Sequence, residues 1–96
     1  MRSVEAPDAE VVRPTEVVLV RTTACHLCED AIDSLMDLAG THPLDVRVVD
    51  ADSLEGEQIV ARYRPGLFPA VFVDGSLFSA GRLPRRKLQG ILKREA

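Results

Sequence analysis

Two cysteines, Cys25 and Cys28, are the residues of this sequence whose type and spacing point to chemistry. They form a Cys-x-x-Cys motif, a separation that two cysteines placed at random in a chain of 96 residues would show in about 2% of cases. At this spacing the two thiols can close a disulfide with each other, and each thiolate can attack another disulfide. The motif therefore predicts reversible thiol–disulfide chemistry.

The position of the motif distinguishes the two thiols. Cys25 falls at or beside the N-cap of a predicted helix, where unpaired backbone N–H groups and the positive end of the helix dipole stabilise a thiolate. Such sites lower a cysteine pKa from about 8.5 to between roughly 3.5 and 7.5. Cys28 lies one turn further along the helix, nearer its buried side. We therefore predict that Cys25 attacks a substrate disulfide and that Cys28 resolves the mixed disulfide.

Three other roles are possible for the cysteine pair. Free cysteines often serve as small buried hydrophobic side chains. A closed zinc site needs four ligands, but His26 points elsewhere on the predicted helix and His42 lies at its opposite end, so we expect no metal site within one chain. An iron–sulfur cluster shared by two chains needs only two thiolates from each chain, which keeps a dimeric cluster carrier as an alternative.

The elements that position the motif follow from the hydrophobic pattern. The apolar run Val17–Val20 predicts a strand over Glu16–Arg21 that is buried on both faces. From Leu27 to Ala39, apolar residues recur at spacings of three, four and seven, which predicts an amphipathic helix that ends at Gly40. Leu44–Asp50 is predicted as the second strand.

A second helix is expected after that strand, with Asp52 or Ser53 as its N-cap. Asp52 followed three residues later by Glu55 has the spacing of a capping box. The helix is expected to end before Pro65, and Gly56 inside it costs up to about 1 kcal/mol relative to alanine.

A hairpin and a last helix complete the predicted domain. The runs 69–73 and 76–80 are joined by Asp74-Gly75, which supplies the positive φ angles of a two-residue turn. Pro84 suits the first turn of the last helix. The order β-α-β-α-β-β-α predicts an α/β domain over residues 16–96, with a four-stranded mixed sheet, helices on both faces, and its first two strands parallel.

The rest of the sequence bounds location and partners. Residues 1–15 lack periodicity and are predicted to form a mobile leader, with an edge strand around Val11-Val12 as the alternative. The absence of an apolar run typical of a signal peptide or a membrane span predicts a cytoplasmic protein without a membrane partner. A net charge of −3, with 4% aromatic residues and no Trp, argues against nucleic acid as a partner.

Several segments together carry a family resemblance: 17–20, the motif 25–28, Asp50-Ala51-Asp52, the stretch 68–75 and Gly81. On these segments the sequence resembles the thioredoxin-fold oxidoreductases, and more specifically the small glutaredoxin-like proteins, over about residues 16–94. In that family the proline that opens the third strand has a cis peptide bond and faces the reactive cysteine. The resemblance implies the same for Pro69, and it implies that the backbone of Phe68 pairs with an extended substrate.

The sequence departs from the usual patterns of this family around the site. Ala24 stands where thioredoxins have Trp, and 67–69 reads Leu-Phe-Pro where glutaredoxins usually have Thr-Val-Pro. The segment 79–82, Ser-Ala-Gly-Arg, replaces the Gly-Gly pair and following acid with which glutaredoxins bind glutathione. The resemblance thus leaves the reductant open between glutathione, another small thiol and thioredoxin reductase.

Basic residues are the remaining candidates for a role. His26 is adjacent to Cys25 and, when protonated, would favour its thiolate. Arg21 and Arg64 are candidate ligands for a carboxylate of a thiol peptide, or solvated surface residues. The basic C-terminal region is predicted to be a solvated helix face, with a docking surface as the alternative.

These observations predict a glutaredoxin-like thiol–disulfide oxidoreductase, with Cys25 and Cys28 as its catalytic residues. The predicted substrate-binding residues are His26, Arg64, Phe68 and Pro69. We expect a monomer without a resident cofactor, which exchanges disulfides with a protein or a small-molecule thiol and depends on an external thiol or a reductase. The alternatives are the dimeric iron–sulfur carrier and a non-catalytic thioredoxin-fold interaction module.

Overall fold

The computed structural model describes residues 13–95, which contain four strands and three helices. They follow the predicted order β-α-β-α-β-β-α. Their bounds are β1 (Thr15–Arg21), α2 (His26–Ala39), β2 (Leu44–Asp50), α3 (Leu54–Tyr63), β3 (Ala70–Val73), β4 (Ser76–Ala80) and α4 (Arg85–Glu95). The first strand begins one residue earlier than predicted, inside the predicted leader. The leader's residues 1–12, with the alternative strand around Val11-Val12, lie outside the described residues.

The four strands form one mixed sheet in the order β2-β1-β3-β4. β1 runs parallel to β2, as predicted for a βαβ unit, and the pairing extends from Thr15 opposite Leu44 to Arg21 opposite Asp50. β3 is antiparallel to both of its neighbours, β1 and β4. The sheet therefore brings the carboxyl-terminal ends of β1 and β2 together at one edge of the fold.

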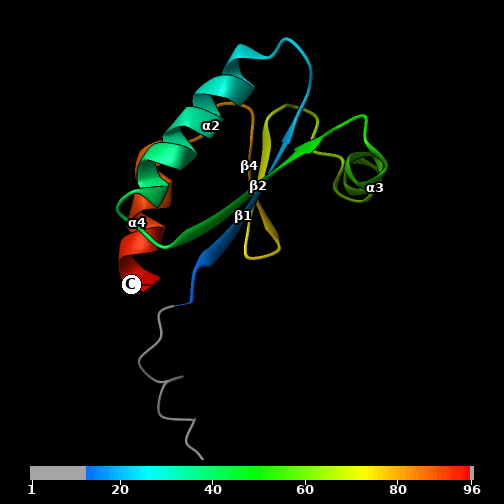
Figure 1. The fold of residues 1–96 in the computed structure, drawn as a ribbon. Coiled ribbons are helices and arrows are strands. Elements are labelled where there is room, and N and C mark those ends of the chain that lie inside the picture. Colours follow the sequence, from blue (N-terminus) through cyan, green and yellow to red (C-terminus); the bar gives the residue numbers. More distant parts are fainter. Residues whose placement is uncertain (1–12, 96) are drawn as a thin grey trace, which may run out of the picture.

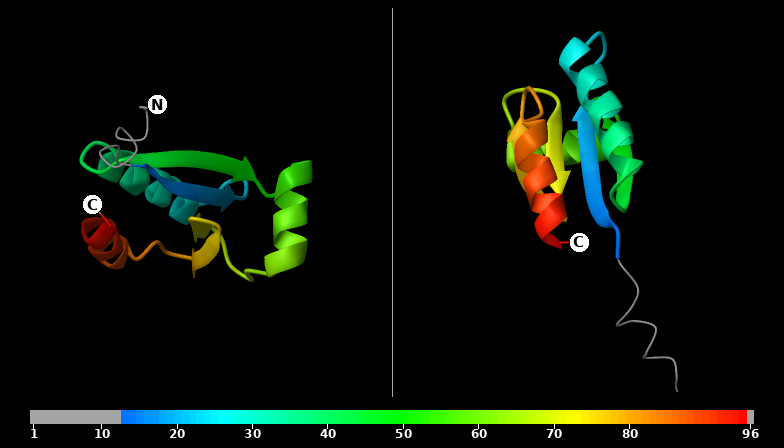
Figure 2. Two further views of the ribbon diagram at one scale, coloured as in Figure 1. Left: turned by 90° about the horizontal axis from the view of Figure 1, so that it is seen from below. Right: turned by 90° about the vertical axis from the view of Figure 1, so that its left-hand side faces the viewer.

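Helices cover both faces of this sheet, which gives three layers (Figures 1 and 2). α2 and α4 pack on one face and α3 on the other. Side chains alternate along a strand, so β1 supplies Val17 and Leu19 to the first face and Val20 to the second. All three are fully buried, which confirms the prediction that this strand is covered on both sides.

The hairpin between β3 and β4 has the predicted Asp-Gly turn. Both of its central residues, Asp74 (φ 48°) and Gly75 (φ 87°), have positive φ angles. A carboxylate oxygen of Asp74 also accepts a 2.9 Å hydrogen bond from the backbone N–H of Glu16, which joins the turn to β1. The turn residue thus fixes both the hairpin and its attachment to the central strand.

The helix starts resolve what the sequence left open. α2 begins at His26, directly after Cys25, in agreement with the predicted N-cap at or beside this cysteine. Ser53 alone caps α3, because its Oγ accepts a 3.0 Å hydrogen bond from the N–H of Gly56, so the predicted capping box between Asp52 and Glu55 is wrong. Glu55 instead pairs with Arg47 of β2 at 2.7 Å.

Pro84 precedes the last helix rather than lying in its first turn. Its carbonyl accepts a 3.1 Å hydrogen bond from the N–H of Leu88. The start of β3 moves by one residue as well, to Ala70, because Pro69 has no N–H to contribute to the sheet.

Candidate active site

Cys25 is the N-cap of α2, as predicted. Its backbone is extended (φ −117°, ψ 104°), and its carbonyl accepts a 3.1 Å hydrogen bond from the N–H of Glu29. Its Sγ accepts a second hydrogen bond, 3.1 Å long, from the N–H of Cys28. The sulfur therefore occupies the position in which Ser, Thr or Asp oxygens usually satisfy the free N–H groups of a helix.

The two cysteines form a disulfide, and their Cα atoms are 5.2 Å apart. Cys25 is half-buried, whereas Cys28 is 1% exposed and belongs to the buried core. Any molecule that approaches the pair from solvent therefore meets the sulfur of Cys25 first. This asymmetry agrees with the position expected for the two thiols from the sequence.

A short loop, Thr22–Ala24, turns the chain from β1 into α2. Its last residue, Ala24, has a φ of +52°, a left-handed conformation that costs an L-residue about 1–2 kcal/mol. The turn places Cys25 directly after this residue. The position of the Cys25 sulfur therefore depends on a strained backbone conformation at Ala24.

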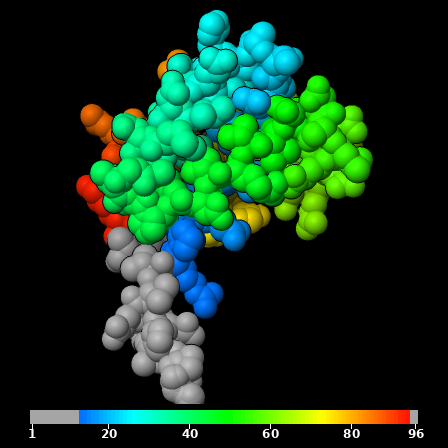
Figure 3. Space-filling model, viewed as in Figure 1, coloured from blue at the N-terminus to red at the C-terminus, as the bar shows by residue number. Residues whose placement is uncertain are grey.

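A cleft of about 440 Å³ lies beside the disulfide, between the β1–α2 loop and the junction of β2 with α3. Figure 3 shows these two segments next to each other on the surface. Three of the ten lining residues belong to the loop, and the others come from the adjoining ends of β1 and α2 and from the segment after β2. The residues are Arg21, Thr22, Thr23, Ala24, Cys25, Cys28, Glu29, Asp50, Ala51 and Asp52.

An ion pair joins the ends of the two parallel strands within the lining of the cleft. Nε of Arg21 lies 2.8 Å from a carboxylate oxygen of Asp50, and the carbonyl of Arg21 accepts a 2.8 Å hydrogen bond from the N–H of Ala51. The hydrogen bond to Asp50 and the charge of that carboxylate raise the pKa of Arg21 above its ordinary value, and Glu29 adds to this increase. Arg21 is therefore a permanent cation beside the disulfide.

Gly56 lets α3 pack closely against the junction that lines the cleft. A Cβ at this position would overlap the carbonyl oxygen of Asp50 and lie 2.8 Å from Cα of Ala51. The sequence showed only the cost of a glycine inside a helix. The structure supplies the reason, because no larger residue allows this approach.

The peptide bond between Phe68 and Pro69 is cis, as the family resemblance implied. Pro69 is fully buried, and its carbonyl accepts a 2.9 Å hydrogen bond from the N–H of Gly81. The next residue, Ala70, pairs with Val20 near the end of β1. Pro69 therefore lies at the end of the sheet from which β1 leads to the cysteine motif.

The structure brings only part of the predicted site to the cleft. Arg21 lines it, whereas Phe68 and Pro69 do not. His26 is exposed on α2 and does not line the cleft. Arg64 does not line it either; it is the C-cap of α3, in a left-handed conformation (φ 46°).

The acidic residues of the cleft were not predicted as binding residues. Asp52 entered only as a candidate helix cap and as part of the segment that carries the family resemblance, and Glu29 was not singled out. The parallel pairing of β1 with β2 is what places Asp50 and Asp52 opposite the cysteine loop. The signal for them was the segment Asp50-Ala51-Asp52, which the family resemblance had already included.

The residues that could ligate a metal are few around the motif. Within residues 13–95, no group of three or more His, Cys, Asp or Glu side chains is arranged to hold a metal ion. A shared cluster would therefore have to take its ligands from Cys25 and Cys28 of two chains.

None of the helices within residues 13–95 is long and apolar enough to cross a membrane.

Comparisons with known proteins agree with this geometry. The sequence profile of the glutaredoxin-like domain family (DUF836) matches residues 16–93, which include every helix and strand except the ends of the first and last. No curated protein sequence matches the chain.

Solved structures show the same fold. The protein Ne2328 from Nitrosomonas europaea has a TM-score of 0.69 at 24% identity, over 85% of this chain and 95% of that one. The reduced thioredoxin pre-protein of Schistosoma mansoni has a TM-score of 0.66 at 18% identity, over 97% and 90% of the two chains. Fasciola hepatica thioredoxin gives 0.62 at 22% identity, over 97% and 91%. The chain thus has the thioredoxin fold that the sequence predicted.

Proposed function

The chain belongs to the glutaredoxin-like domain family, and we propose that it is a thiol–disulfide oxidoreductase in which Cys25 attacks and Cys28 resolves. The observation that carries this proposal is the position of the two sulfurs. Cys25 caps a helix beside an open cleft, and Cys28 is buried directly behind it. A pair that served only as core hydrophobes would not need a half-buried sulfur at a helix N-cap.

The reaction begins with the reduced protein. The thiolate of Cys25 attacks one sulfur of the substrate disulfide, a new S–S bond forms to Cys25, and the other substrate sulfur leaves as a thiolate that takes a proton from solvent. The helix N-terminus and the N–H of Cys28 favour the attacking thiolate. Because these groups are fixed by the helix, they need no rearrangement at the moment of attack.

In the resolving step, the mixed disulfide between Cys25 and the substrate is replaced by a disulfide within the protein. Cys28 loses its proton and attacks Sγ of Cys25, which forms the intramolecular disulfide and releases the second substrate sulfur as a thiolate, protonated from solvent. The dithiol loses two electrons and the substrate gains them. An external thiol or a dithiol reductase returns the electrons by the reverse sequence, so the cycle needs no resident cofactor.

Pro69 and Phe68 are proposed to shape the approach of the substrate. Pro69 is buried and has no N–H, and the backbone of Phe68 beside it is proposed to pair with an extended substrate chain, as the family resemblance implies. We further propose that the protein acts as a monomer in the cytoplasm, on a protein disulfide or a small-molecule disulfide. His26 and Arg64 are weaker candidates for substrate contact, since neither lines the cleft.

Single cysteine variants test the two roles. Cys28→Ser keeps the nucleophile and lacks the resolving thiol, so it should accumulate mixed disulfides through Cys25, detectable by mass spectrometry without reductant. Cys25→Ser should accumulate far fewer, because its remaining thiol is buried. Equal trapping by the two variants would contradict the assigned roles. A wild-type protein that reduces no disulfide, with glutathione, another small thiol or thioredoxin reductase as the reductant, would contradict the function.

The cluster alternative has its own test. A dimer that holds an iron–sulfur cluster between two Cys25–Cys28 pairs should elute as a coloured, iron-containing dimer after anaerobic purification. A colourless, iron-free monomer prepared with iron and sulfide present would exclude it.

A further inference from the structure

We propose that the cleft beside Cys25 selects disulfides flanked by basic residues, and that Glu29 and Asp52 determine this preference. The inference rests on the proposed oxidoreductase function and names the substrate class of that same site. A polypeptide disulfide with Lys or Arg next to its cysteine is the expected substrate, in preference to an anionic small disulfide.

The charges that line the cleft are unbalanced. Among the described residues, Arg21 is the one cation that lines it, together with three carboxylates, those of Glu29, Asp50 and Asp52. Arg21 is already engaged by Asp50 at 2.8 Å. Neither Glu29 nor Asp52 forms an ion pair with another residue in the range 13–95. The cleft therefore has a formal charge of minus two next to the reactive disulfide, and the cation that could offset it is occupied.

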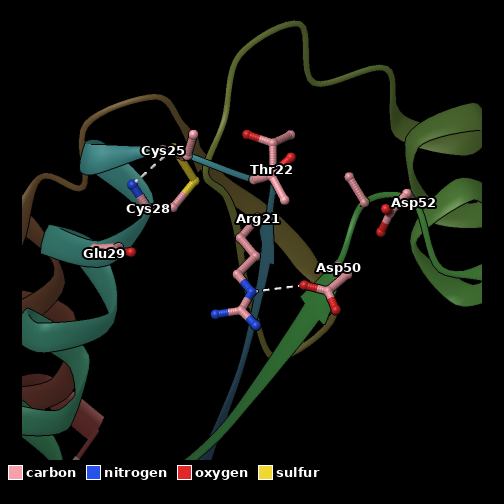
Figure 4. A pocket seen from close by; sticks show the side chains of 10 residues that line it. Arg21, Thr22, Cys25, Cys28, Glu29, Asp50 and Asp52 are labelled. Carbon is pink, nitrogen blue, oxygen red and sulfur yellow. Dashed lines mark hydrogen bonds and ion pairs between the residues drawn. A yellow bond between two sulfur atoms is a disulfide. The ribbon is translucent and has the colours of Figure 1, made fainter.

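The two unpaired carboxylates stand on opposite walls. Figure 4 shows Glu29 on the side of α2, with the cysteines, and Asp52 across the cleft at the start of α3. Arg21 lies between them, held toward Asp50. A substrate sulfur that reaches Cys25 must bring its flanking residues over this space. Flanking groups on either side of the substrate cysteine then meet a negative charge.

Charge complementarity of this kind acts mainly on the rate of association. Clefts lined by one sign of charge raise the on-rates of oppositely charged ligands by about 10–10³-fold, and salt reduces the effect. Both carboxylates are exposed, so we expect the lower end of this range. Glutathione disulfide has more carboxylates than ammonium groups and is therefore an anion. The carboxylates of the cleft repel such a ligand.

The test uses three model peptides with one cysteine, each joined by a disulfide to the same neutral 2-thiopyridyl group. The cysteine is flanked by two Lys, two Gln or two Glu residues, and both peptide ends are blocked. Stopped-flow absorbance of the released thiopyridone gives the second-order rate constant for the fully reduced protein. At low salt we expect the Lys peptide to react about tenfold faster than the Glu peptide, and the ratio to approach one in 0.5 M salt.

Charge variants identify the residues responsible. The Lys-to-Glu rate ratio should fall several-fold in the double variant Glu29→Gln/Asp52→Asn. A matched variant, Asp33→Asn/Asp45→Asn, removes two exposed carboxylates that do not line the cleft and should keep the ratio. The ratio also cancels any change in the reactivity of Cys25 itself, because both peptides meet the same thiol.

Three results would count against the proposal. Equal rates for the three peptides, or a ratio that falls equally in both double variants, would overturn the charge preference. In either case, reaction of the Gln peptide would still support the oxidoreductase function. If the reduced protein reacts with none of the peptides, the proposed function itself fails, and the inference fails with it.

Discussion

The N–H of Cys28 donates a 3.1 Å hydrogen bond to Sγ of Cys25, so the backbone of one cysteine supports the sulfur of the other. A hydrogen bond to the charged form of a group favours that form. In the reduced protein, the same donor should therefore favour the Cys25 thiolate. The proposed role of Cys28 then has two separable parts, a thiol that resolves the mixed disulfide and an N–H that stabilises the Cys25 thiolate.

Two variants at one position separate these parts. Cys28→Ser and Cys28→Pro both lack the resolving thiol, but only the proline variant also lacks the N–H, and proline is tolerated in the first turn of a helix. A hydrogen bond to a charged group contributes roughly 1.5–3 kcal/mol, and about 1.4 kcal/mol corresponds to one pH unit. Alkylation of Cys25 should therefore have its midpoint about one pH unit higher, or more, in Cys28→Pro. Identical midpoints, with both variants folded by circular dichroism, would contradict a role for this N–H.

The sequence predicted those parts of the site that depend on neighbouring residues. The N-cap position of Cys25 follows from the start of one amphipathic helix, and the turn at Asp74 follows from a dipeptide. The parallel sheet followed from the order of the elements. In each case the interaction that decides the structure lies within a few residues or in a general rule of chain connection.

The parts that were missed depend on contacts between distant segments. Arg21 and Asp50 are 29 residues apart and meet only because β1 and β2 pair in one register. Asp52 and Ser53 are both good N-caps by residue type, and the contact between α3 and the end of β2 decides between them. Arg64 was a candidate substrate ligand, and the structure shows it as the left-handed C-cap of α3, outside the lining of the cleft. No local pattern encodes these three outcomes.

Ala24 should limit the stability of the protein. Its φ of +52° is unfavourable for an L-residue and unrestricted for glycine. We expect Ala24→Gly to raise the free energy of unfolding by about 0.5–1 kcal/mol, because the relieved strain exceeds the added entropy of the unfolded chain. Urea denaturation measures the change.

The matched control for this substitution is Ala61→Gly, in the exposed part of α3. A glycine inside a helix lowers stability by about 0.5–1 kcal/mol, so the same exchange should have the opposite sign there. If both variants lose stability, the strain assigned to Ala24 is wrong.

Ser79 places a polar atom in the interior of the fold. Its Oγ is buried and has no hydrogen-bond partner among the described residues. An unsatisfied buried hydroxyl costs about 1–3 kcal/mol. Ser79→Ala should therefore raise the free energy of unfolding by about 1 kcal/mol, whereas Ser76→Ala, at an exposed position of the same strand, should change it by less than about 0.5 kcal/mol. A loss of stability in Ser79→Ala would show that the hydroxyl is satisfied.

Gly56 links the stability of the fold to the shape of the cleft. A methyl group at this position would overlap the carbonyl oxygen of Asp50, and that atom is backbone and has little freedom to move. We expect Gly56→Ala to lower the free energy of unfolding by about 1–3 kcal/mol, as overpacking does elsewhere, although alanine favours helices. It should also displace Asp50 and Asp52 from the cysteine loop, and so reduce the ratio of rates between basic and acidic peptide disulfides.

The control for that exchange is Gly90→Ala, in α4, where an added Cβ would have no atom within 4 Å. There the helix preference of alanine acts alone and should raise stability by about 0.5–1 kcal/mol. Urea denaturation of the two variants therefore gives opposite signs for one and the same substitution. If Gly56→Ala is instead as stable as the wild type, α3 can move away from the end of β2 at no cost. The cleft is then not held in place by that contact, and the pairing of β1 with β2 and the Arg21–Asp50 ion pair hold its walls instead.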